Sequence, residues 1–303
     1  MTTLAQKTRI QYVYDFTALD RVPESQTSAK VAAKRLLSGP TLQTGKSSTV
    51  GAALTGEHII VALAGQSRGS GAKAHTHPNE QFNYIVQGVM TGDIAGELVF
   101  APKGTLMHTP ARVVHTGLAC PDEDLIFLAV KDTRHGIVGP PVDGKYDGPN
   151  YLPGFGTRAG EPMKSTAGLM ADSGRDPAGV KTRYIYDFAH LAEKPGRVSS
   201  AMVTPQVNGT PGSTGPVVTG EMLHVGLLRY ARGGGLQRHS HPNEQFTFVV
   251  EGMVRAEIDG EEALVGKHCV LHVPAGVPHA LAATGEQDAL VVTVQDTRHG
   301  FVG

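Results

Sequence analysis

Short apolar runs alternate with glycine and proline along most of the chain. Runs of four to eight residues, rich in Val, Ile, Leu and Ala, occur at 57–64, 83–86, 125–130 and 289–294. The chain has 38 glycines and 19 prolines, many of which separate these runs. Short apolar runs bounded by turn residues are typical of β-strands. The pattern therefore predicts an all-β protein with tight turns.

The second half of the chain repeats the first, with corresponding residues 164 positions apart. Residues 55–139 and 219–303 align without a gap, and 36 of the 85 aligned pairs are identical. A period of this length indicates a duplicated domain. A chain of 303 residues also has room for two domains with separate cores. We therefore expect two copies of one fold.

A Tyr-x-Tyr-Asp-Phe segment opens each copy and is expected to form the first strand of that copy. The stretch between the copies is rich in Gly, Pro, Asp and Ser and has little periodicity, which is typical of an irregular surface connection. These features predict an N-terminal barrel over 1–140, a Gly/Pro-rich linker over 141–181 and a C-terminal barrel over 182–303.

Histidines recur in both copies at spacings that bring them together. His75 and His77 lie two residues apart on an expected strand, so their side chains share one face. A Pro-Asn turn follows, Gln81 opens the next strand, and a closed barrel would return His115 to the same place. Imidazole and amide oxygen suit a divalent transition metal such as Fe, Mn, Co, Ni or Zn. Up to two ions per chain are expected, because the second copy repeats the set as His239, His241, Gln245 and His279.

At these residues the sequence resembles the cupin superfamily, whose first motif reads Gly-x5-His-x-His, three or four residues, Glu-x6-Gly. Residues 69–88 and 233–252 match this motif, with Gln in the place of Glu. The second motif, Gly-x5-Pro-x-Gly-x2-His, is matched less closely, because Arg112 replaces its second glycine in the first copy and His268 its first glycine in the second copy. The resemblance implies two tandem cupin (jelly-roll) β-barrels, a bicupin, with a metal in each.

Glutamine in the usual place of glutamate changes the expected chemistry. A carboxamide binds through a neutral oxygen, so the ion keeps its full charge of about +2 and becomes a stronger Lewis acid. The site also loses a carboxylate that could accept a proton. The ligand set is similar to that of several redox-neutral cupins, namely the bicupin isomerase of the bacilysin pathway, uronate ring-opening cupins and cupin hydroxynitrile lyases.

This resemblance implies a metalloenzyme that acts on a small oxygenated substrate with a carboxylate or an enolisable carbonyl. Isomerase, tautomerase or lyase chemistry is the preferred interpretation. An O2-dependent non-heme metal dioxygenase is the alternative, since three-histidine iron centres also have open positions. A non-catalytic metal- or ligand-binding cupin is the second alternative, although such a protein would be expected to lose ligands in one copy.

Three further residues are candidates for catalysis. His108 and His272 are equivalent and lie two residues before the motif proline, so they could face the metal and transfer a proton or support a ligand. The alternative is that they are core or rim histidines with satisfied hydrogen bonds. Arg112 lies three residues before a ligand and could bind a substrate carboxylate or lie on the rim without substrate contact. Alternation along the strand predicts that Glu80 and Glu244 face away from the ligand glutamines.

Charge and composition limit the classes of partner that the protein is expected to bind. The formal net charge is -1 and there is no long basic block, which argues against a nucleic-acid surface. No stretch of about 18 apolar residues could span a bilayer, and the first residues lack the apolar core of a signal peptide. We therefore expect a cytoplasmic protein with a small-molecule substrate, no nucleic-acid or membrane partner, and possible homo-oligomerisation.

Overall fold

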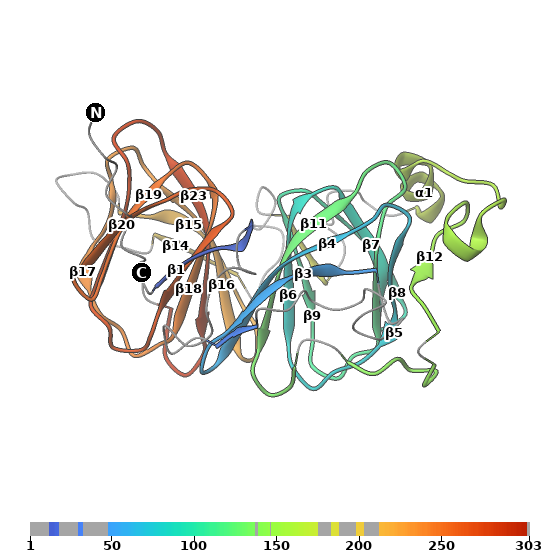
Figure 1. The fold of residues 1–303 in the computed structure, drawn as a ribbon, viewed down its shortest axis with the longest axis horizontal. Helices are drawn as coiled ribbons and strands as arrows, with labels where there is room; N and C mark the ends of the chain where they lie inside the picture. The colour runs from blue at the N-terminus through green and yellow to red at the C-terminus, as the bar shows by residue number, and fades with distance from the viewer. Residues whose placement is uncertain are drawn as a thin grey trace, which may run out of the picture.

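The computed structural model describes residues 12–17, 30–32, 48–136, 139–145, 147–174, 183–187, 198–202 and 212–301. They form two antiparallel β-barrels side by side, which confirms the predicted all-β fold of tandem barrels (Figure 1). The strands of the first half are β1 (Val13–Asp15), β2 (Lys30–Ala32), β3 (Val50–Thr55), β4 (Ile59–Gln66), β5 (Ser70–His75), β6 (Gln81–Gln87), β7 (Val89–Ile94), β8 (Glu97–Pro102), β9 (Thr105–Thr109), β10 (His115–Ala119), β11 (Leu125–Asp132) and β12 (Asn150–Tyr151). Those of the second half are β13 (Ile185–Asp187), β14 (Val198–Met202), β15 (Thr214–Thr219), β16 (Leu223–Tyr230), β17 (Gly235–His239), β18 (Gln245–Glu251), β19 (Val254–Ile258), β20 (Glu261–Val265), β21 (Cys269–Val273), β22 (His279–Ala283) and β23 (Ala289–Asp296).

Each barrel consists of one large and one small sheet. In the first barrel a seven-stranded sheet has the order β13-β9-β6-β11-β4-β3-β2, and a five-stranded sheet has the order β12-β5-β10-β7-β8. The second barrel has the equivalent seven-stranded sheet, β1-β21-β18-β23-β16-β15-β14, and a four-stranded sheet, β17-β22-β19-β20, without a counterpart of β12 among the described residues. Neighbours such as β5 and β10 are distant in sequence, so the barrel brings together ligands that the chain separates.

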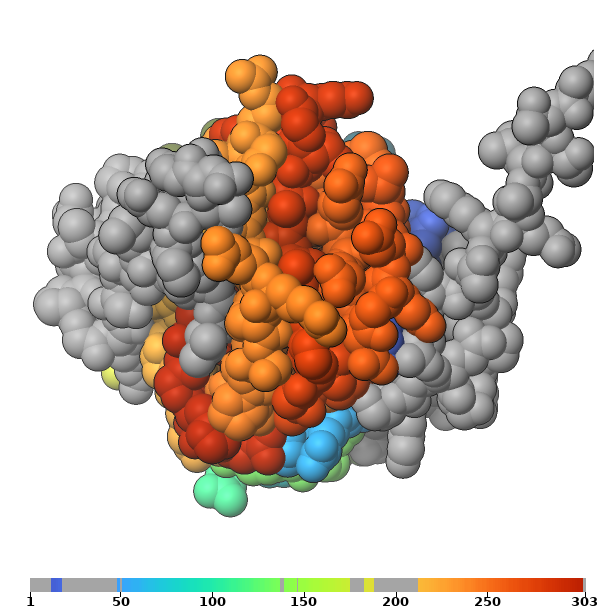
Figure 2. All heavy atoms as spheres, turned by 90° about the vertical axis from the view of Figure 1, so that its left-hand side faces the viewer, coloured from blue at the N-terminus to red at the C-terminus, as the bar shows by residue number. Residues whose placement is uncertain are grey.

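The opening strands of the two copies are exchanged. Strand β1 pairs with β21 of the second barrel, with Val13 opposite Leu271, and β13 pairs with β9 of the first barrel, with Ile185 opposite Met107. Figure 2 views the second barrel from its end and shows the blue atoms of the N-terminal segment beside its orange strands. This differs from the expectation that each copy begins with its own strand. Since both opening segments share one sequence pattern and β9 and β21 are equivalent edges, the sequence gives no preference between the two pairings.

The two large sheets pack face to face between the barrels. Apolar side chains on the outer faces of both sheets form one buried cluster, which includes Phe82 and Leu128 from the first barrel and Phe246 and Val292 from the second. Burial of such side chains contributes roughly 1.5 to 3 kcal/mol each. The interior of each barrel holds a separate apolar cluster. The strands of the large sheets are therefore buried on both faces.

A reciprocal pair of buried glutamates joins the two barrels. Glu80 accepts hydrogen bonds from His108 Nε2 (2.7 Å) and from the backbone N–H groups of Glu221 and Met222 in the other barrel (both 2.9 Å). A Cβ at Gly220 would lie 2.2 Å from Glu80 Oε1, so a larger residue in this turn would displace the carboxylate. Glu80 therefore faces away from the interior of its own barrel, as alternation predicted.

The second glutamate makes the mirror-image contact. Glu244 accepts hydrogen bonds from His272 Nε2 (2.9 Å) and from three backbone N–H groups of the turn that precedes β4, at 2.8 to 3.1 Å. Arg134 adds a bond across the same interface, donating to Glu221 Oε1 at 3.0 Å while its other nitrogens bind Asp132. Each barrel thus inserts a carboxylate into a turn of its neighbour.

The connection between the barrels packs against the first one. Strand β12 pairs with β5, and helix α1 (Thr166–Ser173) begins where the hydroxyl of Ser165 accepts a hydrogen bond from Gly168 N. The helix ends at Gly174, whose φ of 62° suits a left-handed cap. The described residues of the expected linker (141–181) thus include a short strand and a helix, and the bounds of the linker stay a prediction. Among the described residues, no helix is long and apolar enough to cross a membrane.

The buried glutamates predict a measurable loss of stability. In Glu80→Gln, an amide N–H2 replaces an acceptor in front of backbone donors, so we expect the free energy of unfolding to fall by about 2 to 4 kcal/mol. Urea unfolding of the metal-free protein measures it. Glu123→Gln, at an exposed position, is the control and should change stability by less than about 0.5 kcal/mol. Equal effects of the two changes would contradict the role given to Glu80.

The same carboxylates predict a loss of stability in acid. Burial alone would raise the pKa of Glu80, but hydrogen bonds from His108 and the backbone together with the histidine charge lower the pKa below 4.5, and Glu244 behaves alike. Their stabilisation is therefore complete above about pH 4.5 and is lost as the pH falls through the lowered pKa values. We expect stability to decline more steeply below pH 4.5 in the wild type than in Glu80→Gln/Glu244→Gln. Parallel declines in urea unfolding would contradict this account.

Candidate metal centres

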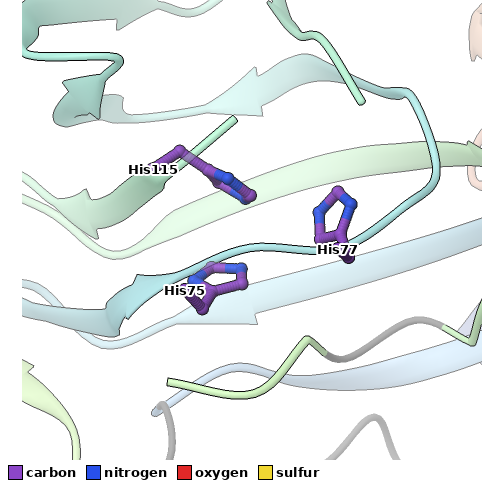
Figure 3. Close-up of side chains that lie close together, drawn as sticks. All are labelled: His75, His77 and His115. Atoms are coloured by element: carbon purple, nitrogen blue, oxygen red, sulfur yellow. The ribbon is translucent and has the colours of Figure 1, made fainter. Parts of the chain in front are cut away.

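Three imidazoles converge at the end of the first barrel. Strands β5 and β10 are antiparallel, and their register places His75 opposite His115. His77 follows two residues after His75, and the side chains of the three histidines point toward one another (Figure 3). One ring nitrogen from each lies within 4.8 Å of the others. The expected grouping of these histidines is therefore present.

Backbone carbonyl groups hold all three rings in one tautomer. The Nδ1 atoms of His75, His77 and His115 lie 2.7, 2.9 and 2.9 Å from backbone oxygens. A carbonyl oxygen only accepts, so in the neutral ring Nδ1 carries the hydrogen and Nε2 keeps a lone pair. This arrangement is typical of histidines that bind metals through Nε2.

Gln81 completes the set of donors. Its Nε2 donates to Asn83 Oδ1 at 2.8 Å, which leaves Oε1 directed at His77 Nε2, 3.1 Å away. Both facing atoms carry lone pairs, and they repel each other unless a cation lies between them. His115 Nε2 is buried and has no hydrogen-bond partner in the described structure. Converging lone pairs and a buried acceptor fit a bound metal ion.

The environment keeps the imidazoles of His77 and His115 neutral. Burial, together with the positive charge of Lys131, lowers the pKa of His77 to about 3. Burial also lowers the pKa of His115 well below 6.5, with further contributions from the neighbouring histidines. A neutral imidazole is the form that binds a metal. The first centre is therefore ready to bind an ion at neutral pH.

The second barrel repeats the centre with the same geometry. Ring nitrogens of His239, His241 and His279 lie within 4.8 Å of one another, and burial lowers the pKa of His279 to about 4. Gln245 Oε1 lies 3.1 Å from His241 Nε2. The Nε2 atoms of His239 and His279 are buried without hydrogen-bond partners among the described residues. Both groups of three histidines therefore fit a metal ion.

One residue beside the ligands distinguishes the two centres. Lys131 lies opposite Gln81 across β6 and β11, and the corresponding residue of the second barrel is Gln295, opposite Gln245. Lys131 is 3% exposed, and burial lowers its pKa to about 7. This lysine was not among the site residues predicted from the sequence. Alignment of the two copies could have indicated it. Lys131 is a charged residue directly after an apolar run, whereas the equivalent residue of the second copy is the neutral Gln295.

The structure places His108 and His272 away from the ligands. His108 lies opposite Phe82 across β6 and β9 and its ring stacks on Phe82, so it occupies the outer face of the sheet while Gln81 occupies the inner face. It hydrogen-bonds to Glu80 in the interface between barrels. His272 has the same position beside Phe246. This corrects the expectation that His108 and His272 could face the metal. Their distance from the motif proline does not determine the face of the strand on which they lie, because that face is set by the cross-strand pairing.

Arg112 lies in the turn before β10. Its backbone N–H donates to His77 O at 2.8 Å, and its φ of 64° is the conformation for which the motif favours glycine. Gly276 makes the same contact to His241 O with a φ of 76°. The side chain of Arg112 is exposed, which favours the alternative of a rim residue. Substrate binding by Arg112 stays a prediction.

Comparisons with known proteins agree with this architecture. The family model described as a cupin domain matches residues 63–131 and again 226–295. The chain is similar to AerE from Microcystis aeruginosa, at 12% identity over 87% of this chain and 96% of that chain, with a TM-score of 0.57. It is similar to a mutant of oxalate decarboxylase OxdC from Bacillus subtilis, at 14% identity over 98% and 80% of the two chains, with a TM-score of 0.56.

A third similar structure is a mutant of salicylate 1,2-dioxygenase from Pseudoaminobacter salicylatoxidans in complex with gentisate. The identity is 17%, the match covers 97% of this chain and 84% of that chain, and the TM-score is 0.54. A search of curated protein sequences gives no match. At these identities the similarity establishes the fold alone.

The two centres predict the metal content of the protein. We expect two transition-metal ions per chain, one ion in His115→Ala or His279→Ala, and none in the double variant, because each change removes one of three imidazoles. Elemental analysis after reconstitution and desalting measures the content. His135→Ala, an exposed histidine of the same repeat, should keep two ions. Two tightly held ions in His115→Ala would show that the first centre is assigned wrongly.

Proposed function

The chain is a two-domain member of the cupin superfamily, and we propose that it is a metalloenzyme for redox-neutral isomerase, tautomerase or lyase chemistry. The proposed substrate is a small molecule with a carboxylate or an enolisable carbonyl. One observation carries the proposal: each centre offers three imidazoles and a carboxamide, with no carboxylate among these donors. A divalent ion in such a set keeps its charge and, when bound, supplies a Lewis acid that stabilises an enolate.

The protein residues would fix the geometry in which this happens. Backbone carbonyls accept hydrogen bonds from Nδ1–H of each imidazole, which fixes the orientation of the rings and favours this tautomer. Asn83 holds the carboxamide of Gln81 with its oxygen toward His77. His77 and His115 are only 2% and 3% exposed, and an environment with little water strengthens the electrostatic stabilisation of an anion. The protein thus provides preorganised donors.

The preferred reaction class predicts proton exchange without oxygen. We expect the zinc-loaded protein in D2O, under strict anaerobiosis, to exchange the protons next to the carbonyl of at least one member of a panel of 2-oxo acids faster than buffer does. Proton NMR measures the exchange, with pyruvate, oxaloacetate, 2-oxoglutarate and phenylpyruvate as the panel. Zinc is redox-inert, so exchange in its presence needs no electron transfer.

Two controls separate the alternatives. His115→Ala/His279→Ala, which lacks a ligand in each centre, should show only the buffer rate, whereas His135→Ala should match the wild type. Oxygen uptake at an electrode by the iron-loaded protein, with no activity in the zinc form, would replace the proposal by a dioxygenase. No exchange with any member of the panel and no oxygen uptake would favour a non-catalytic metal-binding role.

A further inference from the structure

A buried hydroxyl group lies next to the first centre and makes no hydrogen bond among the described residues. Thr109 is the last residue of β9 and is 0% exposed. Its Oγ1 is buried and has no hydrogen-bond partner in the part of the chain that the structure describes. Burying a hydroxyl group without a hydrogen bond costs free energy, so such groups are rare in folded proteins. The hydrogen bonds of the barrel therefore do not account for threonine at this position.

The sheet directs the side chain of Thr109 to the interior of the barrel. Thr109 lies opposite Gln81 across β9 and β6. Directly opposed residues of an antiparallel pair share a face, with Cβ atoms roughly 4.5 to 5.5 Å apart. Met107, two residues earlier on β9, belongs to the apolar cluster of this interior, as alternation along a strand requires. In the turn that follows Thr109, Arg112 N–H donates to His77 O. Thr109 is thus the neighbour of one ligand and directly precedes the turn that contacts another.

The second barrel has the same ligands without this hydroxyl. Val273 occupies the position opposite Gln245 and belongs to the apolar cluster of the second interior. Valine has nearly the shape of threonine, with a methyl group in place of the hydroxyl, so the packing of the barrel accommodates either residue. The second centre offers the same three imidazoles and carboxamide, so a metal ion does not need the hydroxyl either. The Thr109 hydroxyl is therefore available to a molecule bound at the first centre.

We propose that Thr109 is a specificity-determining residue, whose hydroxyl binds a second oxygen of a small molecule that is bound to the metal of the first centre through its first oxygen. The inference rests on the proposed function, which gives the substrate a carboxylate or a carbonyl. It adds that the first centre holds such a substrate at two points and that the second centre, with Val273, lacks the second point. A hydroxyl donates to a carboxylate or keto oxygen. Molecules with oxygens on neighbouring carbons, such as 2-oxo acids, are the class that this arrangement selects.

A binding experiment on the full chain tests this without turnover. His239→Ala/His279→Ala leaves only the first centre, and His75→Ala/His115→Ala leaves only the second. Each variant is loaded with Co2+, whose visible absorption changes when a molecule binds to the ion, and is titrated with pyruvate. Thr109→Val in the protein with only the first centre should raise the Kd for pyruvate about 10- to 100-fold, because a hydrogen bond to a charged oxygen is lost.

Two further substitutions show whether the hydroxyl itself is responsible. Thr109→Ser keeps the hydroxyl and should keep an affinity for pyruvate close to that of the wild type. Val273→Thr introduces the hydroxyl into the protein with only the second centre and should lower its Kd for pyruvate. The affinity for Co2+ should stay the same in all three variants, because none of the substitutions removes a ligand of the ion.

The stability of the metal-free protein provides a control at a second threonine of the same strand. The Thr105 hydroxyl donates to Pro102 O at 2.7 Å, so Thr105→Val should lower the urea concentration at the midpoint of unfolding. Thr109→Val removes a hydroxyl without a partner and should leave this midpoint unchanged or raise it. Thr105→Val should leave the affinity for pyruvate unchanged, because its hydroxyl is already used within the barrel.

The possible outcomes separate the inference from the proposed function. The role of Thr109 would be overturned by an unchanged affinity for pyruvate in Thr109→Val, by the absence of pyruvate binding to the first centre, or by a loss of stability in Thr109→Val as large as in Thr105→Val. Pyruvate binding that depends on Thr109, without proton exchange for any 2-oxo acid, would support the inference and contradict the proposed reaction. Proton exchange with an affinity that Thr109→Val leaves unchanged would support the reaction and contradict the inference.

Discussion

The register of β6 and β18 is the constraint on which both the metal centres and the interface between barrels depend. Glu80, directly before β6, and Phe82 face the neighbouring barrel, whereas Gln81 between them faces the interior. A shift of one residue would exchange these faces, placing a carboxylate beside the imidazoles and a carboxamide in the interface. Because β18 obeys the same alternation, two sites and one interface are determined by the pairing of two equivalent strands.

Within each barrel, the fold holds several hydrogen-bond acceptors close together, and some of these buried ring nitrogens have no hydrogen-bond donor among the described residues. The rings of His75 and His115 have centroids 4.1 Å apart, and their Nδ1 atoms are committed to backbone oxygens. Packing lone pairs together in a buried place costs free energy, which the rest of the barrel must offset. A metal ion that binds there would relieve this repulsion, so we expect binding and folding to be coupled.

Residue spacing was sufficient to predict which histidines lie together, because the period of a strand places His75 and His77 on one face and the repeat gives independent support. The same reasoning was wrong for His108, since the face of a residue on a distant strand depends on cross-strand register, which spacing from a proline does not give. Lys131 was not predicted, because the predicted site residues are those that the two copies share and this position differs between them. A difference between the copies at an inward position was the informative signal.

The strand exchange has a consequence for the order in which the protein can form during synthesis. The edge of β9 receives its partner only after residues 185–187 have been made, and β1 at residues 13–15 must wait for β21 at 269–273. Val13 and Leu271 are separated by 271 − 13 = 258 residues, so this pairing closes nearly the whole chain. Long-range closure of this kind is slow, and an unpaired edge strand is exposed meanwhile. Strand β1 therefore reaches its place in the sheet only after most of the chain that follows it has been made.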